Sequence, residues 1–437
     1  MAATDLADRP VELLAQLLRF DTTNPPGAEG ECIAWISSLL EDLPCEQRTI
    51  ADDTGRPNLI ARLPGRGKAP PLLLQGHVDV VAARGKWKHP PFAGEIHDGY
   101  IWGRGALDMK GGVAMMVAAF MRACAAETPP PGDVILCVLA DEEAGSDHGA
   151  DFLVREHAEL FEGVRFALGE FGGFTMPIAG RRFYPIMVAE KQVCWTGATF
   201  RGPGGHGSLP VRGGAMGKLG RLLNRLDSRR LPVHVTPVVE AMVDAIAADA
   251  PRPMEVLLRA LMQPWATDRL LDVLGERGRM FDPLLHNTAS VTIVAGGEKI
   301  NVIPDEVSVE IDCRLLPGFG PQDVFAELRA LSGVEMELEV IRFDPGAPEP
   351  DMGLFDTLAQ ALRDLDPAAK PIPLLLPAVT DGRFFSRLGI QTYGFLPMQL
   401  PEEMAFMQLV HAEDERLPVG AVEFGTSAIS RVLERFG

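Results

Sequence analysis

The amino-acid sequence predicts a layered α/β fold that is interrupted by an inserted α+β domain. Short β-like runs alternate with helical segments in the first part of the chain, which is the pattern of a sheet covered by helices. The alternation of β-like runs and helical segments changes near Lys191, and it resumes after the Asp-Pro-Gly run at 344–346. The 437 residues also exceed the usual size of one hydrophobic core, so two domains are expected.

Apolar periodicity and turn residues define the elements of the first part. The expected elements are helices at 11–20 and 33–40, strands at 58–63 and 72–74, a helix at 112–126 and a strand at 134–140. Open α/β sheets bind ligands at the carboxyl ends of their strands, so functional residues are expected there.

The middle of the chain predicts the inserted domain. Its expected elements are strands at 193–200, 289–294, 306–315 and 335–341, helices at 215–226 and 321–331, and a glycine-rich turn at 202–207. Helices at 354–365 and 419–436, with the segment 391–395 between them, then complete the first domain. We therefore assign 1–191 and 345–437 to the first domain and 192–344 to the insertion.

Residues 231–280 are expected to add helices to the insertion. Their methionine and leucine content is explained by core packing, with an apolar ligand pocket as the alternative.

Charge and hydropathy exclude several classes of partner. The formal charge of -19 repels nucleic acid and anionic membranes. The basic cluster from Arg221 to Arg230 contains leucines at helical spacing, which favours a solvated helix face over a polyanion site. The longest apolar stretch, 111–126, is interrupted by Arg122 and falls short of the roughly 18 residues that a membrane span needs. We expect a soluble protein without a nucleic-acid or membrane partner.

The six cysteines are scattered without a C-x-x-C pair, so neither a zinc knuckle nor a redox motif is predicted. The first residues are acidic and include Pro10, and they lack the basic and apolar regions of a secretory signal. We expect reduced thiols and a cytoplasmic location.

His77 and Asp79 follow the apolar run at 72–74. Side chains two residues apart on a strand point to the same face, so this imidazole and carboxylate would lie together. The carboxylate could accept the second ring N–H of the histidine and fix its tautomer, as it does at many zinc sites. The H-x-D spacing alone is common, and it gains weight only from the segments that follow.

Asp108 stands in the glycine-lined segment 103–112, ahead of a predicted helix. In such a turn a carboxylate could approach closely and span two ions. Aspartate is also a favoured N-terminal cap of helices, and a cap would explain this residue without a metal.

Asp141, Glu142 and Glu143 directly follow the predicted strand at 134–140. Three carboxylates at the end of a buried strand need cations or hydrogen-bond donors, and a metal is the simplest partner. Because neighbouring side chains point in different directions, one glutamate could ligate while the other stays free as a base beside the metal. A solvated acidic turn is the alternative.

Glu170 ends the run 164–169, and His411 follows the apolar segment 404–410. Each has a structural alternative, as a surface turn residue and as a lone structural histidine. Two imidazoles with several carboxylates nevertheless form a nitrogen and oxygen ligand set, which suits zinc better than magnesium.

His206 lies in the segment 204–210, which is too rich in glycine for core packing. A phosphate-binding loop would require a G-K-[ST] ending, which this segment lacks. We interpret the other histidines as ordinary surface or core residues: His89, His97, His148, His157, His234 and His286.

Taken together, the motifs resemble metallopeptidase family twenty, which includes aminoacylase, carboxypeptidase S, glutamate carboxypeptidase and succinyl-diaminopimelate desuccinylase. The resemblance rests on H-V-D at 77–79, G-R-G-A-L-D-M-K at 103–110, D-E-E-A-G-S at 141–146, Glu170, G-G-H-G-S-L-P at 204–210 and His411. The segments 87–92 and 297–304 look closest to the carboxypeptidase S and N-acyl-amino-acid hydrolase branch. Two positions depart from the family pattern: Ala412 and Gln192 stand where glycine is usual.

The resemblance implies a zinc-exopeptidase-like layered α/β catalytic domain with an inserted α+β lid and dimerisation domain. It also implies two zinc ions, for which cobalt or manganese could substitute. By this resemblance His77 and Glu170 would hold one ion, Glu143 and His411 the other, and Asp108 would bridge both.

The resemblance assigns further roles beyond the ligands. Asp79 would orient His77, and Glu142 would be the general base. In a homodimer His206 would reach the partner subunit's active site and stabilise the tetrahedral oxyanion. Asn301 and Arg314 would bind the substrate and its free carboxylate, for which an arginine fork is well suited.

The implied reaction is zinc-dependent hydrolysis of the amide bond of an N-acyl-amino acid or of a C-terminal peptide bond. A dipeptidase or aminopeptidase of the same family is the alternative, although glutamate rather than aspartate at position 170 favours the first reading by resemblance. A catalytically silent metal-binding protein is the third reading, against which the free Glu142 argues.

Overall fold

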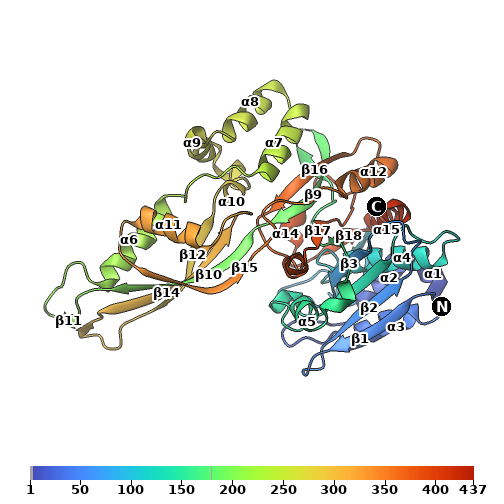
Figure 1. The fold of residues 1–437 in the computed structure, drawn as a ribbon, viewed down its shortest axis with the longest axis horizontal. Helices are drawn as coiled ribbons and strands as arrows, with labels where there is room; N and C mark the ends of the chain where they lie inside the picture. Colours follow the sequence, from blue (N-terminus) through green and yellow to red (C-terminus); the bar gives the residue numbers. More distant parts are fainter. Residues whose placement is uncertain (1–2, 179) are drawn as a thin grey trace. The chain divides into compact units, whose positions relative to one another are not determined.

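The chain divides into two compact units in the computed structural model, which describes residues 3–178 and 180–437. Unit 1 comprises the described residues up to Val188, together with Pro350–Leu374 and Thr380–Gly437. Unit 2 comprises Ala189–Glu349 and Leu375–Val379. The short segment 375–379 therefore belongs to unit 2, whereas the sequence analysis placed it in the first domain. Figure 1 shows the elements of both units.

Unit 1 is built on a nine-stranded sheet with the order β1-β2-β6-β3-β7-β17-β9-β16, and β8 pairs with β9. The strands are β1 (Glu46–Ala51), β2 (Pro57–Leu63), β3 (Leu72–His77), β6 (Val134–Leu139), β7 (Phe166–Gly169), β8 (Met176–Ile178), β9 (Arg181–Glu190), β16 (Lys370–Leu376) and β17 (Gln391–Gly394). The central strands β6, β3, β7 and β17 pair in parallel. Every residue of β3 and β6 is buried, as expected for parallel strands covered on both faces.

Helices cover this sheet, and α4 lies at the centre of the packing. α4 contacts α1, α2, α15, β3 and β6, and its residues from Lys110 to Met121 are all buried. The helices of unit 1 are α1 (Ala3–Ala7), α2 (Pro10–Leu17), α3 (Gly30–Leu40), α4 (Lys110–Ala125), α5 (Ala150–Glu156), α12 (Phe355–Leu365), α13 (Gly382–Phe385), α14 (Phe406–Leu409) and α15 (Val419–Arg435). The predicted α/β class is therefore confirmed.

A small antiparallel sheet adds to unit 1. Its strands are β4 (Glu95–His97), β5 (Tyr100–Trp102) and β18 (Arg416–Pro418), in the order β18-β5-β4. It joins the segment before Asp108 to the segment after His411, because β5 pairs with β18.

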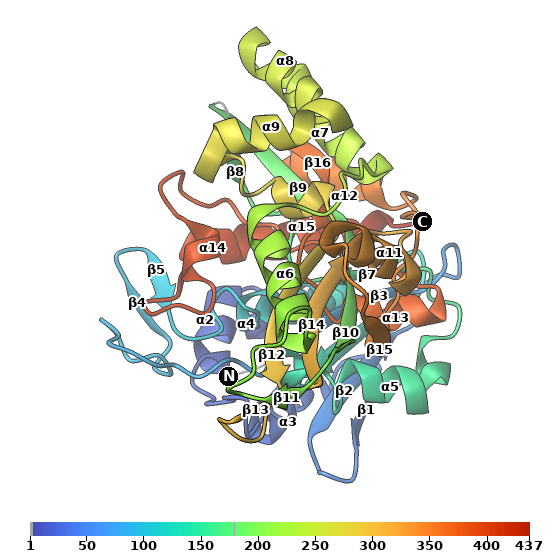
Figure 2. The same ribbon diagram turned by 90° about the vertical axis from the view of Figure 1, so that its left-hand side faces the viewer.

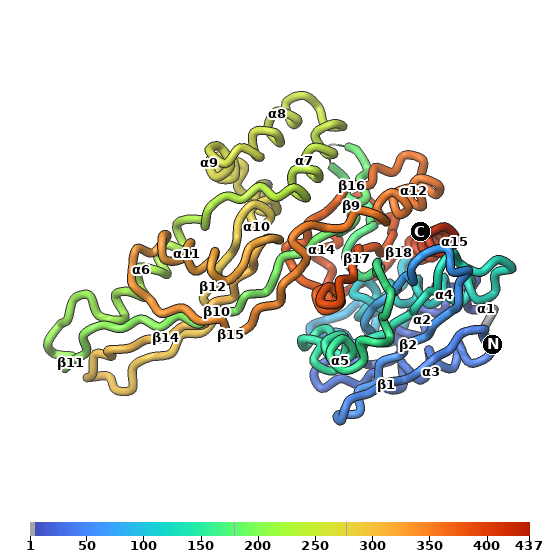
Figure 3. Tube along the Cα trace, in the orientation of Figure 1, coloured from blue at the N-terminus to red at the C-terminus, as the bar shows by residue number. Residues whose placement is uncertain are grey.

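Unit 2 is built on an antiparallel sheet with the order β12-β14-β10-β15, whose chain path can be followed in Figure 3. Its strands are β10 (Gln192–Arg201), β12 (Thr288–Ala295), β14 (Glu306–Leu315) and β15 (Glu337–Asp344), and the strands β11 (Gly205–His206) and β13 (Val302–Ile303) form a separate pair. Its helices are α6 (Ala215–Ser228), α7 (Pro237–Asp249), α8 (Arg252–Leu261), α9 (Pro264–Leu274), α10 (Asp282–Leu285) and α11 (Pro321–Ser332).

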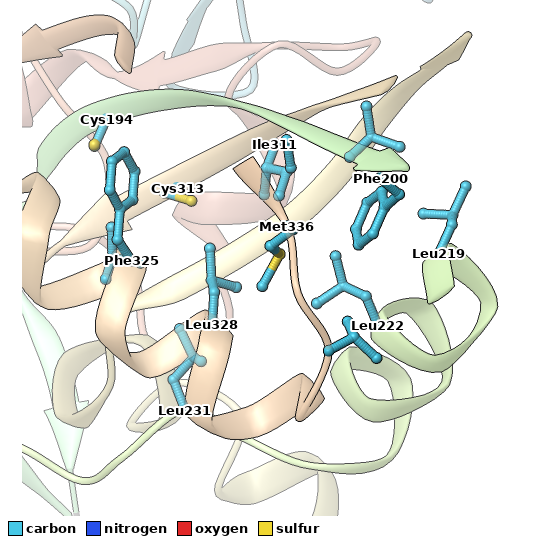
Figure 4. Packing of buried hydrophobic residues seen from close by; sticks show 14 of the residues in the cluster. Cys194, Phe200, Leu219, Leu222, Leu231, Ile311, Cys313, Phe325, Leu328 and Met336 are labelled. Atoms are coloured by element: carbon cyan, nitrogen blue, oxygen red, sulfur yellow. The ribbon is translucent and has the colours of Figure 1, made fainter. Parts of the chain in front are cut away.

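The core of unit 2 lies between this sheet and the helices α6 and α11. Figure 2 shows α6 in front of the strands, and α6 contacts β10, β12 and β14. Phe200 and Ile311 of the sheet pack with Leu222 and Phe325 of the helices (Figure 4).

α7 buries most of its apolar content, including Val239, Met242 and Val243. Core packing therefore accounts for α7, as the sequence analysis favoured, whereas Val256, Trp265 and Val273 of α8 and α9 are exposed. No helix in the described part of the chain has the length and apolar content of a membrane span.

Candidate dinuclear active site

The five predicted metal ligands converge in unit 1. His77 ends β3, Glu143 lies in a 3₁₀ turn (Glu142–Ala144) after β6, and Glu170 follows β7. Asp108 precedes α4, and His411 follows α14. Three of these side chains therefore stand at the carboxyl ends of neighbouring parallel strands, where open α/β sheets bind their ligands.

Asp108 lies between the two imidazoles. Its Oδ1 is 3.2 Å from Nε2 of His77, and its Oδ2 is 3.1 Å from Nε2 of His411. Glu143 Oε1 is 3.2 Å from the His411 nitrogen, and Glu170 Oε2 is 3.7 Å from the His77 nitrogen. A carboxylate that offers one oxygen to each imidazole has the geometry of a ligand bridging two ions.

These separations suit metal ligation. Ligand atoms about 2.1 Å from a tetrahedral ion lie about 3.4 Å from one another, close to the distances found here. His77, Asp108 and Glu143 offer donor atoms that lie within 4.8 Å of one another, and so do His77, Glu142 and Glu170. The residues present therefore fit a pair of divalent ions.

Asp79 contacts both His77 and the turn that carries Glu142 and Glu143. Nδ1 of His77 lies 3.0 Å from the carbonyl oxygen of Asp79 and 3.4 Å from its carboxylate. The same carboxylate accepts hydrogen bonds from Asn24 Nδ2 at 2.8 Å and from the N–H groups of Glu142 and Glu143 at 3.0 and 3.1 Å. The shorter contact of the His77 ring is thus with the backbone carbonyl of Asp79, whereas the predicted partner was its carboxylate, and this carboxylate fixes the turn that carries both glutamates.

The three consecutive carboxylates after β6 differ in their surroundings. Asp141 has a left-handed backbone (φ 70°), and its side chain accepts hydrogen bonds from Arg56, Asn24 and the N–H of His148. The counter-charge of Asp141 is therefore Arg56 rather than a metal ion. Glu142 turns towards His77, with Oε2 4.0 Å from Nε2. Burial, together with the charge of Glu170, raises the pKa of Glu142 well above its usual value.

The pKa values of the clustered side chains show that the site favours bound cations. Hydrogen bonds to Asp108 and Glu143 raise the pKa of His411 to about 10. Burial alone would lower the pKa of His77, but hydrogen bonds to Asp108, Asp79 and Glu170 outweigh it and raise the pKa well above 6.5. Burial raises the pKa of Glu170 to about 7. Without metal the imidazoles hold protons, which divalent ions would replace.

A buried ion pair that the sequence analysis did not identify links two of the ligands. Arg104 and Glu415 are 2% and 0% exposed, and Arg104 Nη1 lies 2.6 Å from Glu415 Oε2. Glu415 accepts the N–H groups of Leu107 and Asp108 at 2.7 and 3.2 Å. Arg104 also donates to the carbonyl oxygen of His411 at 3.2 Å. The arginine of the G-R-G-A-L-D motif was the available sequence signal, but its partner is distant in the sequence.

In unit 2, the β11–β13 pair brings His206 and Asn301 together. The N–H of Gly207 donates to the Asn301 carbonyl at 2.7 Å. The exposed His206 accepts the N–H of Ser208 at Nδ1, at 3.2 Å, and lies 2.8 Å from the Ser208 hydroxyl. Because a backbone N–H can only donate, Nδ1 is the acceptor and the neutral ring carries its proton on Nε2.

Arg314 lies elsewhere in unit 2, near the end of β14. It is eight residues beyond Glu306, where the strand begins, or about 26 Å of extended chain. Asn301 directly precedes β13 of the separate β11–β13 pair, on the other side of Glu306 in the sequence. The guanidinium of Arg314 makes two hydrogen bonds with Asp312, at 2.8 and 3.2 Å. The structure therefore does not bring Asn301 and Arg314 of one chain together.

Comparisons with known proteins identify the family. The sequence model of peptidase family M20/M25/M40 matches residues 73–435. A succinyl-diaminopimelate desuccinylase from Cereibacter sphaeroides (strain ATCC 17025 / ATH 2.4.3) is 36% identical over 98% of this chain and 98% of its own. An N-fatty-acyl-amino acid synthase/hydrolase from Homo sapiens is 28% identical, with 83% of this chain and 74% of the relative covered.

Solved structures show the same fold. An M20 family metallo-carboxypeptidase from Sulfolobus solfataricus superposes with a TM-score of 0.65 at 17% identity, covering 97% of this chain and 98% of that one. Human carnosine dipeptidase 1 gives a TM-score of 0.62 at 17% identity, covering 98% and 96%. The chain belongs to peptidase family M20/M25/M40 and is a hydrolase of amide or peptide bonds.

Proposed function

We propose that the chain hydrolyses the amide bond of an N-acyl-amino acid, or a C-terminal peptide bond, with two zinc ions held by the cluster around Asp108. One observation carries this proposal: the Asp108 carboxylate lies between His77 and His411, and Glu142 lies beside His77. His77 and Glu170 would hold one ion, Glu143 and His411 the other. Cobalt or manganese could replace zinc because the nitrogen and oxygen donors suit all three.

Two ions at this site would lower the pKa of water and polarise the amide carbonyl. Glu142 is suited to remove the proton of the attacking water, because its carboxylate lies beside His77 and is not assigned as a ligand. The same carboxyl group would then deliver the proton to the leaving nitrogen. Asp79 keeps the Glu142 backbone in place during both transfers.

His206, Asn301 and Arg314 would complete the site in a homodimer. The Nε2–H of His206 would donate to the developing oxyanion. Arg314 would bind the substrate carboxylate, and Asn301 another polar group of the substrate. Since Arg314 and Asn301 stand near opposite ends of β14, a single small substrate that contacts both must take them from different subunits.

An exposed edge is available for such an association. β12 is an edge strand of the unit 2 sheet, and Ile293 and Val294 on it are more than half exposed. An unpaired apolar edge readily pairs with another strand. Unit 2 would then be the lid and dimerisation domain and unit 1 the catalytic domain. A cytoplasmic location remains a prediction.

Two cavities touch the proposed ligands. The one that includes Asp108 and Glu170 is lined by Phe171, Phe174 and Phe406, and its volume of about 10 Å³ holds little more than one water molecule. The other, of about 880 Å³, includes His411 and is also lined by Arg84 and Arg104. Cationic side chains therefore line the roomier cavity, and the test below includes both apolar and succinyl groups.

The test is a hydrolysis panel in which one amino acid carries acetyl, longer alkanoyl, phenylacetyl or succinyl groups, with free-amino dipeptides alongside. Each reaction is run with zinc and with a chelator. We expect zinc-dependent release of the amino acid from the acylated substrates, and the relative rates identify the preferred acyl group. Cleavage of the dipeptides alone would move the chain to the dipeptidase or aminopeptidase alternative. A lack of turnover with every substrate would favour a silent metal-binding protein.

A further inference from the structure

His89, Glu95 and His97 form a second group of metal-binding side chains in unit 1, and it shares no residue with the dinuclear site. Glu95 Oε2 lies 2.9 Å from Nε2 of His97 and 3.7 Å from Nδ1 of His89. The two imidazole rings are stacked, with centroids 3.8 Å apart and planes inclined by 14°. Two imidazoles therefore converge on one carboxylate oxygen.

The backbone holds these groups in place. Glu95 and His97 stand two residues apart on β4, so both side chains point to the same face. His89 precedes a loop that is fixed by two hydrogen bonds, from Arg104 N–H to the Pro91 carbonyl at 2.9 Å and from Ala93 N–H to the Pro90 carbonyl at 3.2 Å.

A histidine–glutamate hydrogen bond explains the contact of His97 with Glu95. It does not explain why a second imidazole approaches the same oxygen. The donor separations are close to the roughly 3.4 Å between ligands of a tetrahedral zinc ion. All three side chains are partly exposed, so water can complete the coordination.

We propose that His89, Glu95 and His97 bind a third divalent transition-metal ion, separate from the dinuclear centre. Two imidazole nitrogens and a carboxylate oxygen suit zinc and nickel, and not magnesium or calcium. The bound ion joins the loop after His89 to β4 and so stiffens the three-stranded sheet. Arg104 lies two residues after β5, and Glu415, which accepts the N–H of Asp108, directly precedes β18.

The first test counts zinc. Chelator-treated full-length protein is dialysed against buffered Zn²⁺, and the bound zinc per chain is measured. The wild type is expected to bind one ion more than His97→Ala or His89→Ala, and the double variant should lose no more than either single one. His157→Ala is the matched control, because His157 faces Glu159 at 3.6 Å without a second imidazole. It should keep the wild-type count.

Two further measurements distinguish the loss of the metal site from misfolding of a variant. Glu95→Gln keeps the size of the side chain and should lose the same single ion. Nickel at this site should quench Trp102, whose ring centroid lies 4.7 Å from that of His89, and this saturable quenching should vanish in His97→Ala and in Trp102→Phe. Equal zinc counts in the wild type, His97→Ala and Glu95→Gln at every zinc concentration would overturn the proposal.

Discussion

Arg104→Met tests whether the buried ion pair maintains the geometry of the ligands. Arg104 and Glu415 are almost completely buried, so loss of the arginine leaves the glutamate without its counter-charge. Breaking a buried pair in this way costs about 3–5 kcal/mol. At about 1–2 °C per kcal/mol for a chain of 437 residues, the melting temperature should fall by roughly 3–10 °C. The lost hydrogen bond to the His411 carbonyl should also weaken zinc binding.

The assay is thermal unfolding of the metal-free protein, followed by zinc affinity from competition with a chromophoric chelator. Using the metal-free form keeps metal loss out of the stability measurement. Arg155→Met is the control, since Arg155 is 56% exposed, pairs with the exposed Glu156, and leaves Asp151 paired with Arg387. Exposed pairs contribute about 0–1 kcal/mol.

Glu415→Gln provides a second view of the same pair. It keeps an acceptor for the Leu107 N–H but leaves the Arg104 charge uncompensated. The free energy of unfolding should therefore fall by an amount in the same range. The double variant should lose less than the sum of the single variants, because the pair is coupled. An Arg104→Met protein as stable as Arg155→Met, with unchanged zinc affinity, would refute the reasoning.

Three further outcomes are expected. Zinc loading near pH 7 should release at least two protons, because carboxylates raise the pKa values of His77 and His411 in the metal-free site and burial raises that of Glu170 to about 7. Zinc affinity should therefore rise with pH, and calorimetry in buffers of different ionisation heat measures the release. His206→Gln should lower kcat about 10²–10³-fold with little change in KM, whereas equal kcat would exclude the oxyanion role. Asp79→Asn should cost about 10–100-fold in zinc affinity or activity, and an unchanged titration would contradict its positioning role.

Much of the ligand cluster is predictable because of where strands end. His77 and Glu143 follow apolar runs that had to be buried strands, and strand carboxyl ends meet at one edge of a parallel sheet. The rest depends on partners that are remote in the sequence. Arg104 and Glu415 are 311 positions apart, and no local pattern relates them.

The status of Asp141 also required the structure. Its sequence position matches that of its two neighbours, but Arg56, 85 positions away, supplies its cation. The distance between Asn301 and Arg314 in unit 2 could not be predicted from the sequence either. Asn301 and Arg314 are close in sequence, yet the extended strand β14 between them carries them far apart. Likewise, His89 and His97 look ordinary until the β4 region stacks them.

Glu142→Gln tests the central claim most directly, with zinc content and turnover of the same sample measured together. Glutamine cannot take the proton of the attacking water, and Glu142 is not assigned as a ligand. We predict a fall in kcat of about 10²–10⁴-fold with the zinc content of the dinuclear site unchanged. A kcat like that of the wild type, or a loss of zinc that accounts for the lost turnover, would contradict the account.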